Sequence, residues 1–295
     1  MAAVKPWLDL RGDSRVRRRR FVNRLAEGGA TLAAFIAVGL LGIVVWSIAK
    51  RGAGELSWGF LTKDLPIPFS PDKGGIAPLL VGSAVLVGLA GLMALPLGVG
   101  IAIYLEEFAS SRMRMVVQLA VDLLNGLPSI IIGVFVFGLL VYGHAQTAWA
   151  GSIGLAIVML PLITRSTQEV LALVPSAQRE GALALGASRW RTVLGVVLPS
   201  AFGGILTGTV LAIARAAGET APLLFVTSIY GRTIDWNPAH ALPNATVQIF
   251  IWSESPDPAD HERAWATALV LMMFVLLTSL IARLALARSR RRLGR

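Results

Sequence analysis

The sequence predicts an all-α membrane protein with six transmembrane helices, and two observations carry this prediction. Of its 295 residues, 55% are hydrophobic and only 15% are charged, and the mean hydropathy is +0.68. Several apolar runs reach or exceed the roughly 18 residues that a membrane-spanning helix requires. Since lipid cannot hydrogen-bond to the backbone, runs of this length cross it as helices.

Basic residues flank the first and last apolar runs, with arginine at 17–20 and at 290–292. Loops on the cytoplasmic side of a membrane are enriched in Lys and Arg. Placing both termini and the loops at 105–115 and 169–199 in the cytoplasm puts most of the 27 basic residues there. The topology therefore explains the net charge of +10, and we expect no nucleic-acid partner.

The apolar runs divide the chain into tails, spans and loops. A basic cytoplasmic tail is predicted at 1–26, and a first transmembrane helix, interpreted as an uncleaved anchor, at 27–49. An extracytoplasmic loop follows at 50–75, and a second basic cytoplasmic tail ends the chain at 285–295. The core at 76–284 holds the other five spans, at about 76–104, 116–141, 149–168, 200–229 and 264–284, with the cytoplasmic loop 169–199 after the third of these.

The segment 180–199 is polar and basic although long apolar runs flank it. Ala182 and Gly186 lie four residues apart and share one face of a predicted short helix. Gly186 then favours the end of that helix, and Ser188 can cap a second one. Pro199 marks the return of the chain to the membrane.

This spacing of Glu180, Ala182 and Gly186, followed by Leu-Pro at 198–199, resembles the cytoplasmic EAA loop of ABC-importer permeases. In that family the loop forms a coupling helix that docks into a groove of a separate ATPase subunit. The resemblance implies the type I ABC-importer permease architecture, with Glu180, Gly181, Ala182 and Gly186 as ATPase-docking residues. Gly181 departs from the pattern, which usually has Ala, and this exchange slightly weakens the helix without blocking docking.

The fifth predicted span contains an arginine, Arg215, about sixteen residues from its start and so near the middle of the membrane at about 1.5 Å per residue. An arginine at that depth costs at least about 2.5–3.5 kcal/mol, so it normally faces a cavity or a partner. Glu219 lies one helical turn away and can pair with it. Two interpretations follow: a structural ion pair that orders the helices, or a guanidinium that lines the path of an anion.

The residues around Arg215 favour the second interpretation, because the segment 214–225 resembles the fifth-span motif of the phosphate-specific ABC transporter permeases of the A type. The segments 124–130 and 74–83 are similar to other motifs of that family. The resemblance implies inorganic phosphate as the substrate and Arg215 as a residue of its pathway, with Glu219 and Thr220 at neighbouring positions of the motif.

The same resemblance implies the partners of the chain. They are a homologous C-type permease subunit, two copies of an ABC ATPase subunit, a periplasmic phosphate-binding protein, phosphate and membrane lipid. ATP and Mg would be bound by the ATPase, so no cofactor is expected in this chain, which lacks a GxxxxGK[ST] loop. We expect a transport subunit and not an enzyme, in the bacterial inner membrane with both termini cytoplasmic.

Other possibilities remain open on the sequence alone. A permease of the same architecture could carry another oxyanion, such as phosphonate or molybdate, and a secondary transporter would need no ATPase. The chain has no cysteine, and its three histidines are scattered over predicted outer loops, so no metal site is expected. Asp122 and Asn125 could line the inner mouth of a pathway, but we favour hydrogen bonds to the backbone freed near Pro128.

Overall fold

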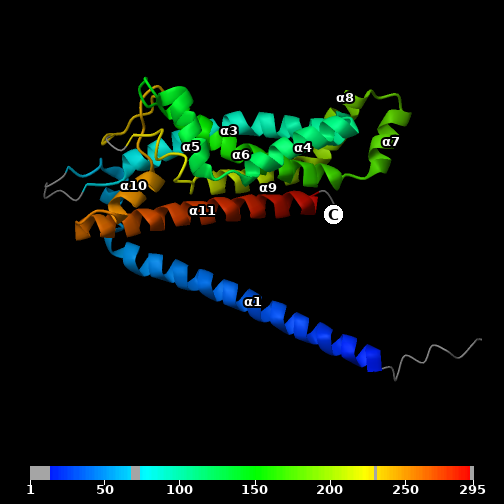
Figure 1. Ribbon diagram of the computed structural model, residues 1–295, viewed down its shortest axis with the longest axis horizontal. Coiled ribbons are helices and arrows are strands. Elements are labelled where there is room, and N and C mark those ends of the chain that lie inside the picture. The colour runs from blue at the N-terminus through cyan, green and yellow to red at the C-terminus, as the bar shows by residue number, and fades with distance from the viewer. Residues whose placement is uncertain (1–13, 68–73, 229–230, 293–295) are drawn as a thin grey trace, which may run out of the picture. The chain divides into compact units, whose positions relative to one another are not determined.

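The computed structural model describes residues 14–67, 74–228 and 231–292, and all regular structure within these ranges is helical (Figure 1). The helices are, in chain order, α1 (Ser14–Gly52), η1 (Ala53–Glu55), α2 (Trp58–Thr62), α3 (Ala77–Ile103), η2 (Tyr104–Phe108), α4 (Ser111–Gly126), α5 (Ser129–Val136), η3 (Phe137–Val141), α6 (Ala148–Ala172), α7 (Ser176–Ala184), α8 (Arg189–Thr192), η4 (Val193–Val197), α9 (Leu198–Ala216), α10 (Ala245–Ser253) and α11 (Pro258–Arg292).

In the described residues, five helical stretches are long and apolar enough to cross a membrane, or six if the bent pair formed by α4 and α5–η3 is one span. The all-α class is therefore confirmed. The chain divides into two units, residues 1–50 and 51–295. In the first unit, α1 begins at Ser14, so the predicted basic tail is helical from that residue on, because residues 15–26 contain neither Gly nor Pro. Residues 1–13 lie outside the described part.

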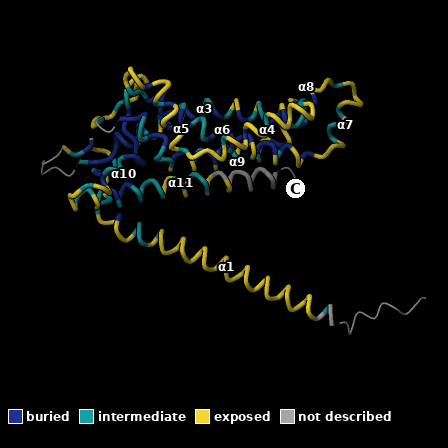
Figure 2. The backbone as a smooth tube through the Cα atoms, viewed as in Figure 1, coloured by how far each residue is buried: buried dark blue, intermediate teal, exposed yellow. Residues whose placement is uncertain are grey.

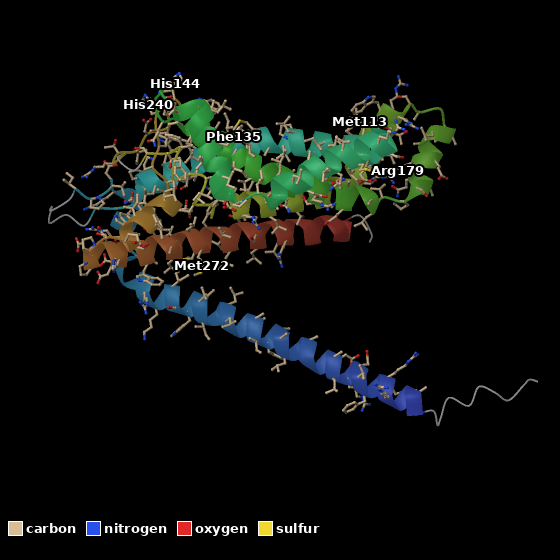
Figure 3. All side chains as sticks on the ribbon, in the orientation of Figure 1. Met113, Phe135, His144, Arg179, His240 and Met272 are labelled. Carbon is tan, nitrogen blue, oxygen red and sulfur yellow. The ribbon has the colours of Figure 1, made fainter. Side chains whose placement is uncertain are left out.

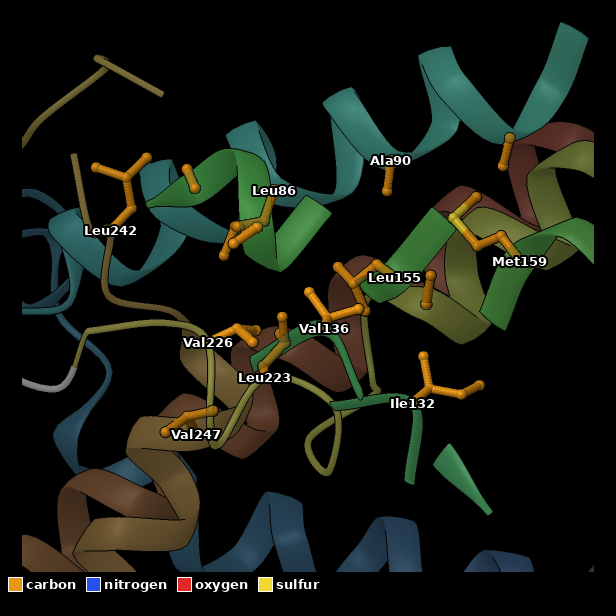
Figure 4. Packing of buried hydrophobic residues seen from close by; sticks show 14 of the residues in the cluster. Leu86, Ala90, Ile132, Val136, Leu155, Met159, Leu223, Val226, Leu242 and Val247 are labelled. Atoms are coloured by element: carbon orange, nitrogen blue, oxygen red, sulfur yellow. The ribbon is translucent and has the colours of Figure 1, made fainter. Parts of the chain in front are cut away.

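In the second unit, α3, α6 and α9 run side by side and form the centre of the bundle (Figure 1). Their main apolar cluster includes Leu86 and Ala90 of α3 and Leu155 and Met159 of α6 (Figure 4). Glycines on these helices permit the close approach, since a side chain at Gly98 would meet Ile163 of the neighbouring helix. Small residues at helix contacts are typical of membrane proteins.

The third predicted span, 116–141, is not one continuous helix but a bent pair of helices, α4 and α5–η3, which passes as a single span only if the two are taken together. The chain bends by 97° between α4 and α5. Leu127 and Pro128 have extended backbone at the bend. Pro128 cannot donate an amide hydrogen to the turn before it, so a helix that reaches it must stop or kink. The consequence is that α4 ends at Gly126 and that α5 leaves the bend in another direction.

The bounds of the fifth predicted span, 200–229, differ from those of the helix. The apolar helical stretch runs from Arg189 to Ala216, and residues 217–228 form turns. Gly218 and Pro222 disfavour continuation of the helix. The turns satisfy part of the freed backbone, since the amide of Gly218 donates to the carbonyl of Arg215 at 3.0 Å.

The irregular segment after α9 is held by the start of α10, which lies between the last two predicted spans. The side chain of Asn244 caps α10 by accepting from the amide of Val247, and its amide group donates to the hydroxyl of Thr227 at 2.9 Å. The amide of Ala245 donates to the hydroxyl of Ser83 on α3 at 2.9 Å. These bonds tie residues 217–228 to α10 and α10 to α3.

Two smaller boundary differences remain. Helix α6 continues to Ala172, beyond the predicted end at 168. Helix α11 begins at Pro258 and continues to Arg292, so it extends into the tail predicted at 285–295. Residues 293–295 lie outside the described part.

The predicted inner and outer loops gather at opposite ends of the second unit. At one end, Arg179 of the loop 169–199 bonds to Glu107 of the loop 105–115. At the other end, the amide of Leu65 donates to the carbonyl of Arg232 at 3.0 Å. Figure 3 shows Arg179 at the first end and His240 at the other.

Gly82 of α3 lies where no side chain fits, and this can be tested. A Cβ atom there would lie 1.8 Å from the carbonyl oxygen of Pro243, a backbone atom. We expect Gly82→Ala to reduce stability by about 1–3 kcal/mol, the usual cost of overpacking, and to lower the unfolding temperature of the purified protein in detergent. Gly88→Ala on the same helix is the control, since nothing lies within 4 Å of its Cβ position. Equal unfolding temperatures for the two variants would contradict this contact.

Candidate functional site

Arg215 lies in the last turn of α9 and borders a small hollow of about 100 Å³. Its Nε atom is 3.6 Å from Oε1 of Glu219, so the predicted pairing is present. The two side chains differ in burial, since that of Arg215 is 65% exposed and that of Glu219 only 17%. The guanidinium is therefore the accessible partner of the pair, while the carboxylate lies among protein atoms.

The hollow lies at the middle of the bundle. It is lined by Val158 and Leu162, which flank the centre of α6 (Ala148–Ala172). Arg215 thus lies level with the centre of α6, and α9 ends there and does not continue. The hollow can hold roughly three water molecules or a small ion of similar size, at about 30 Å³ for each water.

The bend between α4 and α5 brings two neutral polar residues to the same hollow. Asn125 lies at the end of α4 and Ser129 at the start of α5, and both line the cavity together with Arg215 and Glu219. Asn125 therefore borders the hollow, and its place in a substrate pathway stays a prediction. The sequence signal that could have located both residues is Pro128. A proline breaks a helix, and a broken helix inside a membrane protein commonly borders a cavity.

Two other sequence candidates lie apart from the hollow. Asp122 pairs with Arg165 of α6 at 3.2 Å, so it joins two helices. Thr220 is half-buried, and its carbonyl accepts from the amides of Leu223 and Leu224 in the turns after α9. Thr220 is not among the residues that line the hollow. Its contacts are those of a residue that shapes the chain after Glu219.

The predicted coupling segment forms the short helices α7 and α8, which are largely exposed (Figure 2). Glu180 and Gly181 are exposed on α7, and Ala182 is half-buried. Gly186 has a φ of +83°, the left-handed conformation that a helix end favours and that suits glycine. The amide of Gly186 donates to the carbonyl of Leu183, and that of Ala187 to the carbonyl of Ala182. This pattern is the Schellman motif, so Gly186 ends the helix as predicted.

Sequence reasoning did not single out the apolar side chains that this segment exposes. Leu185 is 90% exposed, and Leu183 and Trp190 are exposed as well. Exposed apolar residues grouped between charged ones are typical of a surface that another protein covers. They neighbour Glu180 and Gly186, so the residues predicted to dock an ATPase and an exposed apolar surface occupy the same segment.

Within the described residues, no group of three or more His, Cys, Asp or Glu side chains is arranged to hold a metal ion. The larger hollows lie elsewhere. One of about 630 Å³ is lined by apolar residues of α3, α4, α5 and α6 and by Leu127 of the bend. Another of about 660 Å³ lies near the start of α11 and carries both Arg263 and Asp260.

The family of sequences described as the binding-protein-dependent transport system inner membrane component matches residues 94–293. Curated relatives include two named phosphate transport system permease protein PstA. The one from Haemophilus influenzae is 36% identical over 90% of this chain and 94% of its own length. The one from Xylella fastidiosa strain 9a5c is 38% identical over 93% of this chain and 96% of its own length. A relative from Mycobacterium tuberculosis strain H37Rv, named phosphate transport system permease protein PstA 1, is 35% identical over 94% and 92%.

Solved structures of similar fold belong to other ABC transporters. A chain of a bacterial alginate ABC transporter in complex with an alginate-bound periplasmic protein has a TM-score of 0.63 at 15% identity, with 89% of this chain and 94% of that chain covered. A chain of an inward-facing MetNI methionine ABC transporter has a TM-score of 0.57 at 17% identity, with 72% and 94% covered. At these identities the likeness concerns the fold.

The left-handed backbone at Gly186 leads to a test. A Cβ atom there costs about 1–2 kcal/mol in this conformation, so we expect Gly186→Ala to loosen the end of α7 and to speed hydrogen exchange of the amides at 185–187. Gly181→Ala is the control, because Gly181 is helical and nothing lies within 4 Å of its Cβ position. The control is expected to leave exchange unchanged or slower. Equal exchange in both variants would show that the motif does not depend on glycine.

Proposed function

Because this chain belongs to the family of binding-protein-dependent transport system inner membrane components, we propose that it is the permease subunit of an ATP-driven importer of inorganic phosphate. The names of its relatives support phosphate as the substrate. The observation that carries the proposal is the accessible guanidinium of Arg215 beside a hollow at the middle of the bundle. A cation at that depth is costly unless it meets an anion.

The chemistry of the hollow suits a tetrahedral oxyanion. A guanidinium presents several N–H donors in a planar fork that matches phosphate oxygens. The contact to Glu219 is 3.6 Å, longer than the roughly 2.7–2.9 Å of a close charge-assisted hydrogen bond. The donors of Arg215 therefore stay free enough to bind an anion. The carboxylate beside it weakens the binding, which lets the anion leave on the other side.

The exposure of Arg215 supports a second permease subunit. With 65% of its side chain uncovered, one side of the hollow is open in this chain. In the proposed assembly, a homologous C-type permease covers that side across a pseudo-twofold axis. The pathway then runs between the two permeases.

The energy for transport comes from other polypeptides in this proposal. An ATPase subunit docks on α7 of this chain through Glu180, Gly181, Ala182 and Gly186, and a second copy docks on the partner permease. ATP and Mg bind to these subunits, so the chain itself holds no cofactor. A periplasmic phosphate-binding protein docks at the opposite end of the bundle, and both termini of this chain lie in the cytoplasm of a bacterial cell.

The alternatives differ in measurable ways. A permease for phosphonate or molybdate would show uptake of radiolabelled phosphate that these anions compete away at equal concentration. An ATP-independent transporter would keep its uptake after ATP depletion. The exposed apolar surface of α7 and α8 favours the ATPase-dependent reading, because such a surface needs a protein partner.

Replacement of Arg215 tests the anion site. We expect Arg215→Gln to reduce phosphate uptake by at least about tenfold, since a hydrogen bond to a charged group contributes about 1.5–3 kcal/mol and 1.4 kcal/mol corresponds to tenfold. Uptake is measured in proteoliposomes that hold the whole transporter, after the assembled complex has been quantified. Arg215→Lys keeps the charge and is expected to retain more uptake than the glutamine variant. Wild-type uptake by Arg215→Gln would remove Arg215 from the pathway.

Replacement of Leu185 tests the docking surface. We expect Leu185→Asp to reduce the ATPase subunit that co-purifies with the permease by about tenfold or more, because an unpaired charge would be buried in the interface. Ser176→Asp places the same charge at an exposed position at the other end of α7 and is expected to leave co-purification intact. If the Leu185 variant retains its ATPase as well as the Ser176 variant does, docking does not involve the apolar surface of α7.

A further inference from the structure

The π-helical turn η2 lies at the end of α3. Three consecutive side chains of this turn contact four other helices. Glu106 reaches α4 and α6, Glu107 reaches α7, and Phe108 reaches α8. The amide of Ala109 closes the turn by donating to the carbonyl of Tyr104 at 2.8 Å. Single π-helical turns within α-helices occur frequently at functional sites.

The contact of Glu107 is with Arg179 of α7. Nε and Nη2 of Arg179 donate to Oε1 of Glu107 at 3.0 and 2.9 Å. The same guanidinium donates to the backbone carbonyls of Leu171 and Val174, where α6 ends. The side chains of Arg179 and Glu107 are 24% and 12% exposed, so water does little to weaken the pair. One guanidinium thus joins the coupling helix to the ends of α3 and α6.

A second contact joins the same turn to α8. The rings of Phe108 and Trp190 pack with their centroids 4.8 Å apart at an angle of 35°. Offset aromatic pairs at this separation are attractive. The segment that carries α7 and α8 is therefore attached to η2 at both of its helices.

Glu106 connects η2 in the other direction. It forms an ion pair with Arg114 of α4, and it accepts from Nε2 of Gln168 of α6 at 3.4 Å. The side chain of Gln168 also donates to Gln118 of α4 at 3.0 Å. The turn is therefore bound to two transmembrane helices on one side and to the coupling segment on the other.

We propose that η2 is the clamp through which movement of the coupling segment reaches the transmembrane helices, with Glu107 and Arg179 as its positioning pair. The inference rests on the proposed function, since it needs an ATPase that moves α7. Helix α7 contributes no buried residue to the bundle. Without the pair, α7 could turn about its exposed flanking residues, and the motion would be lost before it reached α3 and α6.

Loss of the pair separates ATP hydrolysis from transport. We expect Glu107→Gln to lower the number of phosphate ions moved per ATP hydrolysed by at least about fivefold, the lower range of typical coupling between sites. The complete complex is reconstituted with its binding protein, and hydrolysis, uptake and bound ATPase are measured in the same sample. The ATPase is expected to stay bound and active. Arg112→Gln is the control, because it removes an exposed positive charge at the start of α4, close in sequence to the same turn.

A double variant tests whether the two residues act as one unit. We expect the double variant Glu107→Gln with Arg179→Gln to move as many phosphate ions per ATP hydrolysed as Arg179→Gln alone. The effects of replacing two residues in contact do not add up. Because the chain has no cysteine, a bridge can replace the pair. Glu107→Cys with Arg179→Cys is expected to be uncoupled when reduced and to regain coupling when a bifunctional maleimide joins the two thiols. Recovery of coupling would show that the reduced variant is uncoupled because the contact is lost and not because the protein is misfolded.

The outcomes distinguish this proposal from the function on which it rests. A wild-type complex without ATP-dependent phosphate uptake would overturn the proposed function. With wild-type uptake present, an unchanged phosphate-to-ATP ratio in Glu107→Gln would overturn the clamp. Loss of the ATPase from that variant would overturn it too, because Glu107 would then serve docking and not transmission.

Discussion

The rest of the structure depends on how α9 ends inside the bundle. A backbone that leaves its helix within lipid must find new hydrogen-bond partners. The chain after α9 finds them in its own turns and in α10, where the hydroxyl of Thr246 donates to the carbonyl of Glu219 at 3.0 Å. The side-chain amide of Asn244 donates to the hydroxyl of Thr227, which lies further along the same segment. These bonds fix the segment after Arg215, so the guanidinium is presented to a hollow and not packed within a continuous helix.

The bend at Pro128 ends α4 at the same hollow, and the two helix ends together form its polar lining. Neither end alone would do so. The end of α9 and the turn after it supply the charged pair, and the two sides of the bend supply Asn125 and Ser129, neutral groups that can hydrogen-bond. Discontinuous helices at the middle of a transporter are a recurrent way of bringing such groups to a substrate.

Two long helices that pack together, α3 and α6, run from this part of the bundle to the coupling segment. Helix α6 borders the hollow at Val158 and Leu162 and ends at the carbonyls that Arg179 binds. Helix α3 contacts α10 near its start through Ser83 and continues into η2 at its other end. Packed helices transmit displacement because their interiors are close-packed. The polar contacts at the two ends therefore belong to the same pair of packed helices, α3 and α6.

Sequence alone determined the local features of this protein: the apolar runs, the spacing that places Glu219 one turn after Arg215, and the glycine that ends α7. Each depends on residues within a few positions of one another. Only the tertiary structure decided that α9 ends at Ala216 and which distant side chains come together, such as Asn125 and Arg215 around one hollow and Glu107 with Arg179. A helix end in lipid is stable only if partners from elsewhere in the chain satisfy its backbone, and those partners are known only once the chain has folded.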